Sequence, residues 1–263
     1  MTGPQKGQMV KVVRDTWLVM QHEGRLIIRS TPALALSLVQ PIAYLVFFTP
    51  FLKAVMANEG VTSYGDAYQI YVPGLFTAMG LFGGLFAGFG FLAMLRQGVI
   101  DRYRVTPITR TGLVLGRALT HVTVIVFTSV VIVIGAFILG LRVQIGNLLL
   151  AYLLMAMMVL LSVSVSYDVA LLVRSETSLS NMVNTVAQPV SLLAGILIPI
   201  SLAPLWIRDI ALWNPFAWAA NAMRALFTDH PGAAVVWQGA VIVTTLAVLS
   251  IALTTRLFNH EIS

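Results

Sequence analysis

The chain has 263 residues, of which 58% are hydrophobic and 10% are charged, and its formal net charge is +6 at pH 7. Soluble globular domains average about 25% charged residues, so the composition excludes an ordinary soluble domain and indicates an all-α integral membrane protein. The 16 basic residues flank apolar runs instead of forming a stripe, which favours topology signals and headgroup contacts over nucleic-acid binding. Cysteine is absent, which excludes disulfides and cysteine metal sites.

Residues 1–32 are predicted to form an amphipathic segment on the cytosolic leaflet. Its basic residues lie off a line of apolar residues that recur at helical spacing. The apolar residues are Val10, Val13, Trp17, Met20 and Ile27. The pattern is typical of a helix lying in the membrane interface; a surface helix packed on protein is the alternative. Pro32 is expected to break this helix before residues 33–263, which are predicted to form the membrane domain.

Span one is predicted at residues 33–52, with Gln40 and Pro41 at its middle. A proline there removes one backbone hydrogen bond and kinks the helix. Pro50 is expected to help end it. The loop that follows carries one base against two acids, which fits the outer side.

Span two is predicted at residues 70–95 and is rich in glycine. Gly80, Gly84 and Gly88 repeat every four residues on one face. Since helices in lipid associate through small residues, this spacing predicts a close helix contact, within or between subunits. A phosphate-binding loop is excluded, because no lysine of the chain follows a glycine in the frame that a P-loop requires.

The longest charged island, residues 96–117, follows span two and carries five arginines against one acid. Basic residues concentrate in short cytoplasmic loops, so we place the island in the cytosol. Between a glycine and a proline, apolar residues at helical spacing alternate with arginines, which predicts a short amphipathic helix that a soluble partner could bind. The residues concerned are Gly98, Val99, Asp101, Arg102, Tyr103, Arg104 and Pro107. An ordinary solvated loop is the alternative.

Spans three and four are predicted at residues 113–139 and 147–173. Near the inner end of span four lies Asp168, and His121 lies at a comparable depth in span three. An acid within a span is costly and usually faces protein or water. A proton relay and a structural polar contact are both open interpretations.

Span five is predicted at residues 179–200 and carries a polar line at heptad-like spacing. Its members in the substrate-path prediction are Asn181, Asn184, Gln188 and Ser191, together with Gln40 of span one. Unsatisfied amides are costly in hydrocarbon, so this face must meet a partner helix or a hydrated path. A path or central interface is favoured over static interhelical hydrogen bonds.

Residues 199–231 are too broken for a span and too apolar for a free loop. Their prolines and aromatic residues predict paired interfacial or re-entrant helices on the outer face. The residues expected to form this outer gate are Pro199, Trp206, Trp213, Asn214, Pro215 and Arg224. Span six is predicted at residues 233–257. Placing both termini, the island and the Arg174 turn inside leaves only Lys53, Arg142, Arg208 and Arg224 outside, which fits six spans.

Four stretches resemble the membrane subunit of an ABC type-2 exporter, most closely the drug-resistance branch typified by daunorubicin export. They are RSTPALALSLVQPIAYLVFF, YVPGLF, RQGVIDRYRVTPITRTGLVLGR and LLAGILIPISLAPLWIRDIALWNPFAWAANAMR. The resemblance implies two membrane subunits, identical or related, and two cytosolic ATPase subunits that hold the ATP and magnesium. It also implies that residues 98–107 form the coupling helix, that the segment before Pro32 is the elbow and that residues 199–224 form the outer gate.

This resemblance predicts a non-enzymatic transporter subunit in a bacterial inner membrane, with both termini in the cytosol and no cofactor or metal of its own. The polar line on span five favours a small amphipathic drug or natural product as cargo. A glycan or lipid-linked polymer is the alternative, and a lipid-modifying membrane enzyme is a further one. That enzyme would need converging acid and base groups, and the spans offer only His121 and Asp168.

Overall fold

The structure is a computed structural model that describes residues 4–29, 31–57, 60–96 and 109–261, and all regular secondary structure within them is helical. The long helices are α1 (Pro4–Arg29), α2 (Thr31–Val55), α3 (Tyr64–Arg96), α5 (Arg110–Ile138), α6 (Ile145–Val173), α7 (Glu176–Leu193) and α10 (Ala234–Glu261). A 3-10 turn (Ile200–Leu202), α8 (Leu205–Ala211) and α9 (Pro215–Phe227) separate α7 from α10.

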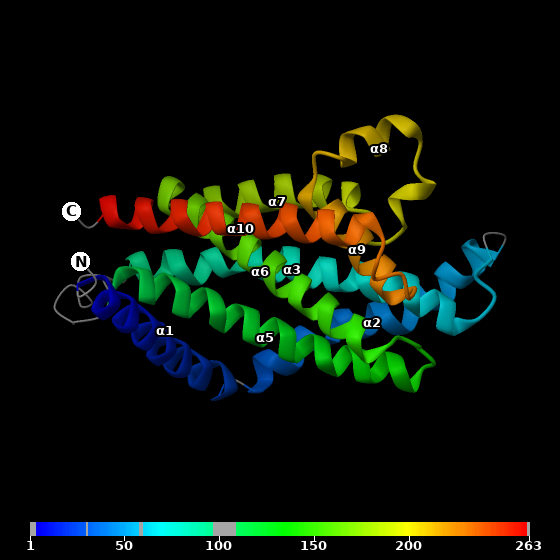
Figure 1. Ribbon diagram of the computed structural model, residues 1–263, viewed down its shortest axis with the longest axis horizontal. Coiled ribbons are helices and arrows are strands. Elements are labelled where there is room, and N and C mark those ends of the chain that lie inside the picture. Colours follow the sequence, from blue (N-terminus) through cyan, green and yellow to red (C-terminus); the bar gives the residue numbers. More distant parts are fainter. Residues whose placement is uncertain (1–3, 30, 58–59, 97–108, 262–263) are drawn as a thin grey trace.

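The long helices lie side by side in an elongated bundle (Figure 1). The two chain termini lie at one end of this bundle, and α8 and α9 lie toward the other. Within the described residues, five helices are long and apolar enough to cross a membrane, namely α2, α3, α5, α6 and α10. The chain is therefore a multi-pass helical membrane protein.

Helix α7 corresponds to predicted span five but is not one of these five helices. It is 18 residues long, and its sequence, ETSLSNMVNTVAQPVSLL, includes a glutamate, two asparagines and a glutamine. These polar residues lower its hydropathy, so composition alone does not identify α7 as a membrane span.

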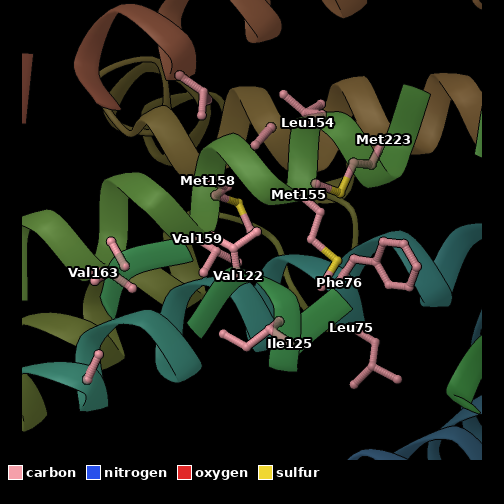
Figure 2. Packing of buried hydrophobic residues seen from close by; sticks show 14 of the residues in the cluster. Leu75, Phe76, Val122, Ile125, Leu154, Met155, Met158, Val159, Val163 and Met223 are labelled. Carbon is pink, nitrogen blue, oxygen red and sulfur yellow. The ribbon is translucent and has the colours of Figure 1, made fainter. Parts of the chain in front are cut away.

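The core is built around α6, which packs against α3, α5, α9 and α10. Its residues Met155, Met158 and Val159 are fully buried and lie among side chains of neighbouring helices, including Phe76 and Ile125 (Figure 2). Methionine is unbranched and fills irregular gaps. Helix α6 is therefore the central helix of the bundle, and α3, α5, α9 and α10 pack around it.

The prolines of α2 do not end it. Pro41 and Pro50 both lie inside the helix, which continues to Val55, so the prediction that Pro50 helps to end span one is wrong. A proline removes one donor but leaves the preceding hydrogen bonds intact, and losing one bond near the end of a helix is tolerated in membranes. Pro32 is the second residue of α2, a position at which proline fits a helix start.

Candidate functional site

The end of α3 lies beside the turn that joins α6 to α7. Arg96 ends α3, and its guanidinium lies 3.5 Å from the carboxylate of Glu176 at the start of α7. Its Nη2 also donates a hydrogen bond of 3.0 Å to the carbonyl oxygen of Arg174, between α6 and α7. The residues predicted to form the coupling helix lie outside the described residues. They are Gly98, Val99, Asp101, Arg102, Tyr103, Arg104 and Pro107.

Two faces of α7 differ sharply. Leu179, Val183 and Ala187 recur every four residues and are buried in the core, where α7 packs mainly against α3. The opposite face carries Asn181, Asn184 and Gln188, which are exposed.

The hydrogen bonds of Asn184 and Ser191 stay within α7 itself. The Asn184 amide donates to the Ser180 carbonyl oxygen at 2.9 Å. Ser191 is buried, unlike the three amides, and its hydroxyl donates to the Gln188 carbonyl oxygen at 2.8 Å. The chain alone therefore leaves a row of amide side chains on the outside of a largely apolar body.

Gln40 is not brought to this row. It is exposed on α2, which packs against α3 and α5, whereas α7 packs against α3, α6, α8 and α9. Within one chain the two predicted parts of a substrate path are separate surfaces.

The glycine row of α3 faces α6 of the same chain. A Cβ added to Gly80 would lie 2.2 Å from the Met158 side chain, and one added to Gly84 would lie 2.3 Å from Cβ of Ser162. At Gly88 the backbone N–H donates to the Ser166 hydroxyl at 3.1 Å. The absence of side chains thus lets the two helix backbones come into contact.

At the other end of α7, the residue that caps α9 is hydrogen-bonded to α7. The Asn214 amide donates to the Val190 carbonyl oxygen at 2.8 Å, and its carbonyl oxygen accepts from the Phe216 N–H at 3.0 Å. Arg224 donates through Nη2 to the carbonyl oxygen of Gly195, in the turn that leaves α7. Gly195 has φ of +66°, a conformation that side chains rarely adopt.

The other predicted gate residues frame this turn. Pro199 directly precedes the 3-10 turn, and Pro215 is the first residue of α9, where a proline is favourable. Trp206 on α8 is exposed, and Trp213 just after α8 is 90% exposed. Both indoles are therefore available to the membrane interface or to a partner.

Residues 14–228 match the ABC-2 type transporter family. This chain is a member of the ABC-2 type transporter family. The match covers most of the chain, from within α1 to the end of α9, so it includes both the island and the α7–α9 region. No curated protein matches the chain closely enough to add a relative. ABC-2 proteins are membrane permease components of transporters, and the family generally works with a cytosolic ATPase.

Asp168 of this ABC-2 protein is held by α10, a helix outside the family match. Its Oδ1 accepts a hydrogen bond of 2.6 Å from the Thr254 hydroxyl, and its Oδ2 accepts one of 3.2 Å from Ser250. His121 makes no hydrogen bond to Asp168 in the described part of the chain. The geometry fits the interpretation of a structural polar contact between helices.

Two acids of α1 were not singled out by sequence reasoning. The Asp15 carboxylate accepts a hydrogen bond of 2.8 Å from the Thr109 backbone N–H, and Glu23 lies 3.3 Å from Arg117 of α5. The available signal was the pair Gly112 and Gly116, whose four-residue spacing on α5 permits a close helix neighbour. Within the described residues, no group of three or more histidines and acids comes together as a metal site.

Proposed function

We propose that this ABC-2 protein is the membrane subunit of an ATP-driven exporter that moves small amphipathic compounds out of a bacterial cell. Two cytosolic ATPase subunits, which carry the ATP and magnesium, supply the energy. A second membrane subunit, identical or related, completes the transport path. Both termini and the charged island face the cytosol, and α8 and α9 lie on the outer side.

The observation that carries this proposal is the exposed amide face of α7. The helix has 18 residues and is therefore about 27 Å long, close to the hydrocarbon thickness of about 30 Å. We assign it as the sixth crossing helix, despite its low hydropathy. Amide groups that face lipid without partners are costly. A second subunit and a hydrated path between the two copies would give Asn181, Asn184 and Gln188 the polar surroundings that one chain lacks.

Energy enters from outside the chain in this proposal. The sequence contains no P-loop, and residues 98–107 join two helices, α3 and α5, that pack against the central helix α6. A displacement of this segment by the ATPase would bias the bundle between inward-open and outward-open states. Gly98, Val99, Asp101, Arg102, Tyr103, Arg104 and Pro107 are its proposed contact residues.

The cargo is inferred from the chemistry of the α7 face. Amide and hydroxyl groups can hydrogen-bond many small amphipathic molecules, whereas a sugar polymer is better matched by stacking aromatic rings. The indoles in this region, Trp206 and Trp213, lie at the outer helices and not on α7. Glycan export remains the second candidate, and the row of amides is the observation that favours small compounds over it.

The test is reconstitution with an ATPase. The reading frames next to this chain are searched for a P-loop ATPase, and the candidate is co-expressed with the chain. The purified pair is inserted into vesicles together with a panel of cationic dyes and a labelled oligosaccharide. We expect ATP-dependent movement of a dye that disappears when the P-loop lysine of the ATPase is replaced. Movement of the oligosaccharide alone would favour the glycan alternative, and transport without ATP or any ATPase would overturn the proposal.

A further inference from the structure

Helices α1 and α5 run side by side in the same direction. The Thr109 N–H, at the start of α5, donates to Oδ2 of Asp15 at 2.8 Å. Two turns further along both helices, Nε of Arg117 lies 3.3 Å from Glu23. Asp15 is only 2% exposed, so the first of these contacts is shielded from water.

Two glycines of α5 let the helices approach closely between these polar contacts. A Cβ added to Gly112 would lie 2.9 Å from Cβ of Asp15, and one added to Gly116 would lie 2.7 Å from Cβ of Val19 and 2.8 Å from the carbonyl oxygen of Thr16. Because these neighbours include backbone and Cβ atoms, α1 has little room to roll or slide along α5.

The N-terminus of α5 lacks a cap of its own. Its first helical residue is Arg110, its first turn contains no acid, and the side chain of Thr109 makes no capping hydrogen bond. The N-terminal end of a helix carries partial positive charge and unpaired N–H groups, which an acceptor anion stabilises. Asp15 supplies that anion from a different helix.

We propose that Asp15 is a positioning residue that joins α1 to the start of α5, so that α1 and the first turns of α5 move as one body during transport. This inference rests on the proposed function. Helix α5 begins at Arg110, within the island and just after residues 98–107, and α1 leads into α2. A displacement of the island would therefore reach α2 through α1 as well as reaching α5 directly, and two spans would shift together.

The first test uses the chain alone in lipid nanodiscs. The sequence has no cysteine, so spin labels attach only to cysteines introduced at Gln21 of α1 and Thr123 of α5, which are both exposed. We expect a narrow distance distribution in the otherwise unchanged chain and a broad one in Asp15→Ala. Asp15→Asn keeps an oxygen acceptor for the Thr109 N–H and should stay narrow. A narrow distribution in Asp15→Ala would overturn the proposal.

The second test uses the chain with its ATPase. The α1–α5 distance should be the same in the nucleotide-free and ATP-bound states, although transport occurs. Asp15→Ala should keep ATP hydrolysis and lose transport per ATP by about fivefold or more, the lower end of typical coupling between sites. Arg14→Ala removes the exposed base that lies 3.7 Å from Asp15 Oδ1. It should keep normal coupling, because the Thr109 N–H still bonds Oδ2 of Asp15.

Three results distinguish a failure of the single-body proposal from a failure of the proposed exporter function. A wild-type α1–α5 distance that changes on ATP binding would overturn the single-body proposal. If Asp15→Ala does not fold, Asp15→Val replaces it, because valine keeps a side chain of similar volume but offers no oxygen acceptor to the Thr109 N–H. Normal transport per ATP with a narrow distance in that variant would overturn the proposal. If no ATPase supports transport, the exporter function fails, while the distances in the chain alone still decide whether Asp15 joins the two helices.

Discussion

The backbone N–H of Gly88 donates a hydrogen bond of 3.1 Å to the hydroxyl of Ser166. The same hydroxyl donates to the carbonyl oxygen of Leu85, one turn earlier on α3. A side chain of α6 therefore bonds directly to the backbone of α3. Such contact is possible because the residues of α3 that face α6 here are glycines, which leave its backbone accessible.

Replacing Gly84 by alanine should destabilise this contact. The new Cβ would lie 2.3 Å from Cβ of Ser162, 3.0 Å from the backbone nitrogen of Val163 and 3.1 Å from the Val159 carbonyl oxygen, so the helices would have to separate. We expect a loss of about 1–3 kcal/mol in the free energy of unfolding, typical of overpacking. Thermal unfolding of the purified chain measures it.

Gly90→Ala is the matched control, since nothing lies within 4 Å of a Cβ at that position of the same helix. Alanine is the better helix former by about 1 kcal/mol, so this variant should be as stable as the parent or slightly more stable. Equal melting temperatures for Gly84→Ala and Gly90→Ala would contradict the packing argument.

Removing the hydroxyl of Thr254 should weaken the contact between α6 and α10. Thr254→Val deletes the 2.6 Å hydrogen bond to Asp168 and leaves that carboxyl with the longer bond to Ser250. Interhelical hydrogen bonds in membranes average about 0.6 kcal/mol and reach about 1.7 kcal/mol, and we expect a loss near the upper value because the acceptor is an acid. Urea or thermal unfolding in detergent provides the measurement.

Thr255→Val is the control for this change. Its hydroxyl donates to the Ile251 carbonyl oxygen of its own helix, so its removal breaks no contact between helices. Thr254→Ser keeps the hydroxyl and should recover most of the stability. If Thr255→Val were as damaging as Thr254→Val, the effect would belong to α10 itself and not to Asp168.

Much of the membrane architecture could be predicted from hydropathy. The five apolar helices lie close to the predicted spans, because lipid demands long continuous apolar segments that a single sequence displays. Helix α7 could be located as a helix but not confirmed as a span. Its amide residues lower the mean hydropathy of the helix, although one of its faces is apolar. The extension of α2 past Pro50 depends on whether the helix tolerates one missing hydrogen bond, and the local sequence does not predict this.

The contacts between helices were less predictable. The glycine row of α3 predicts a close helix neighbour, but its spacing does not predict that this neighbour is α6. The sequence does not single out Asp15 and Glu23, because their partners Thr109 and Arg117 lie 94 residues away in each case. Pairing over that separation follows from how the bundle packs, which one sequence alone does not specify.

Replacing Arg224 should loosen the turn that follows α7, which we propose to lie on the outer side. Its guanidinium bonds the Gly195 carbonyl oxygen, and Ile196 next to it is buried. In Arg224→Met the turn loses this bond, so a cysteine introduced at Ile196 should react faster with a membrane-impermeant maleimide added outside intact cells. Arg208→Met is the control, because Arg208 bonds carbonyl oxygens of its own segment, at Ser201 and Ala203. Equal labelling rates in both variants would argue against a role for Arg224 in closing the turn.

Replacing Asn184 by leucine should affect transport more than folding. The Asn184 amide is exposed, and among the described residues it bonds only to Ser180 of its own helix. Asn184→Leu therefore removes no hydrogen bond between the described helices and makes α7 more compatible with lipid. We expect an unchanged or higher melting temperature and a fall in ATP-dependent transport of at least about fivefold, the change that about 1 kcal/mol in a barrier produces. Met182→Leu, an apolar exchange at an exposed position of α7, should leave both quantities unchanged. Loss of assembly into pairs without any change in the range of compounds transported would instead assign the α7 face to static contacts between subunits.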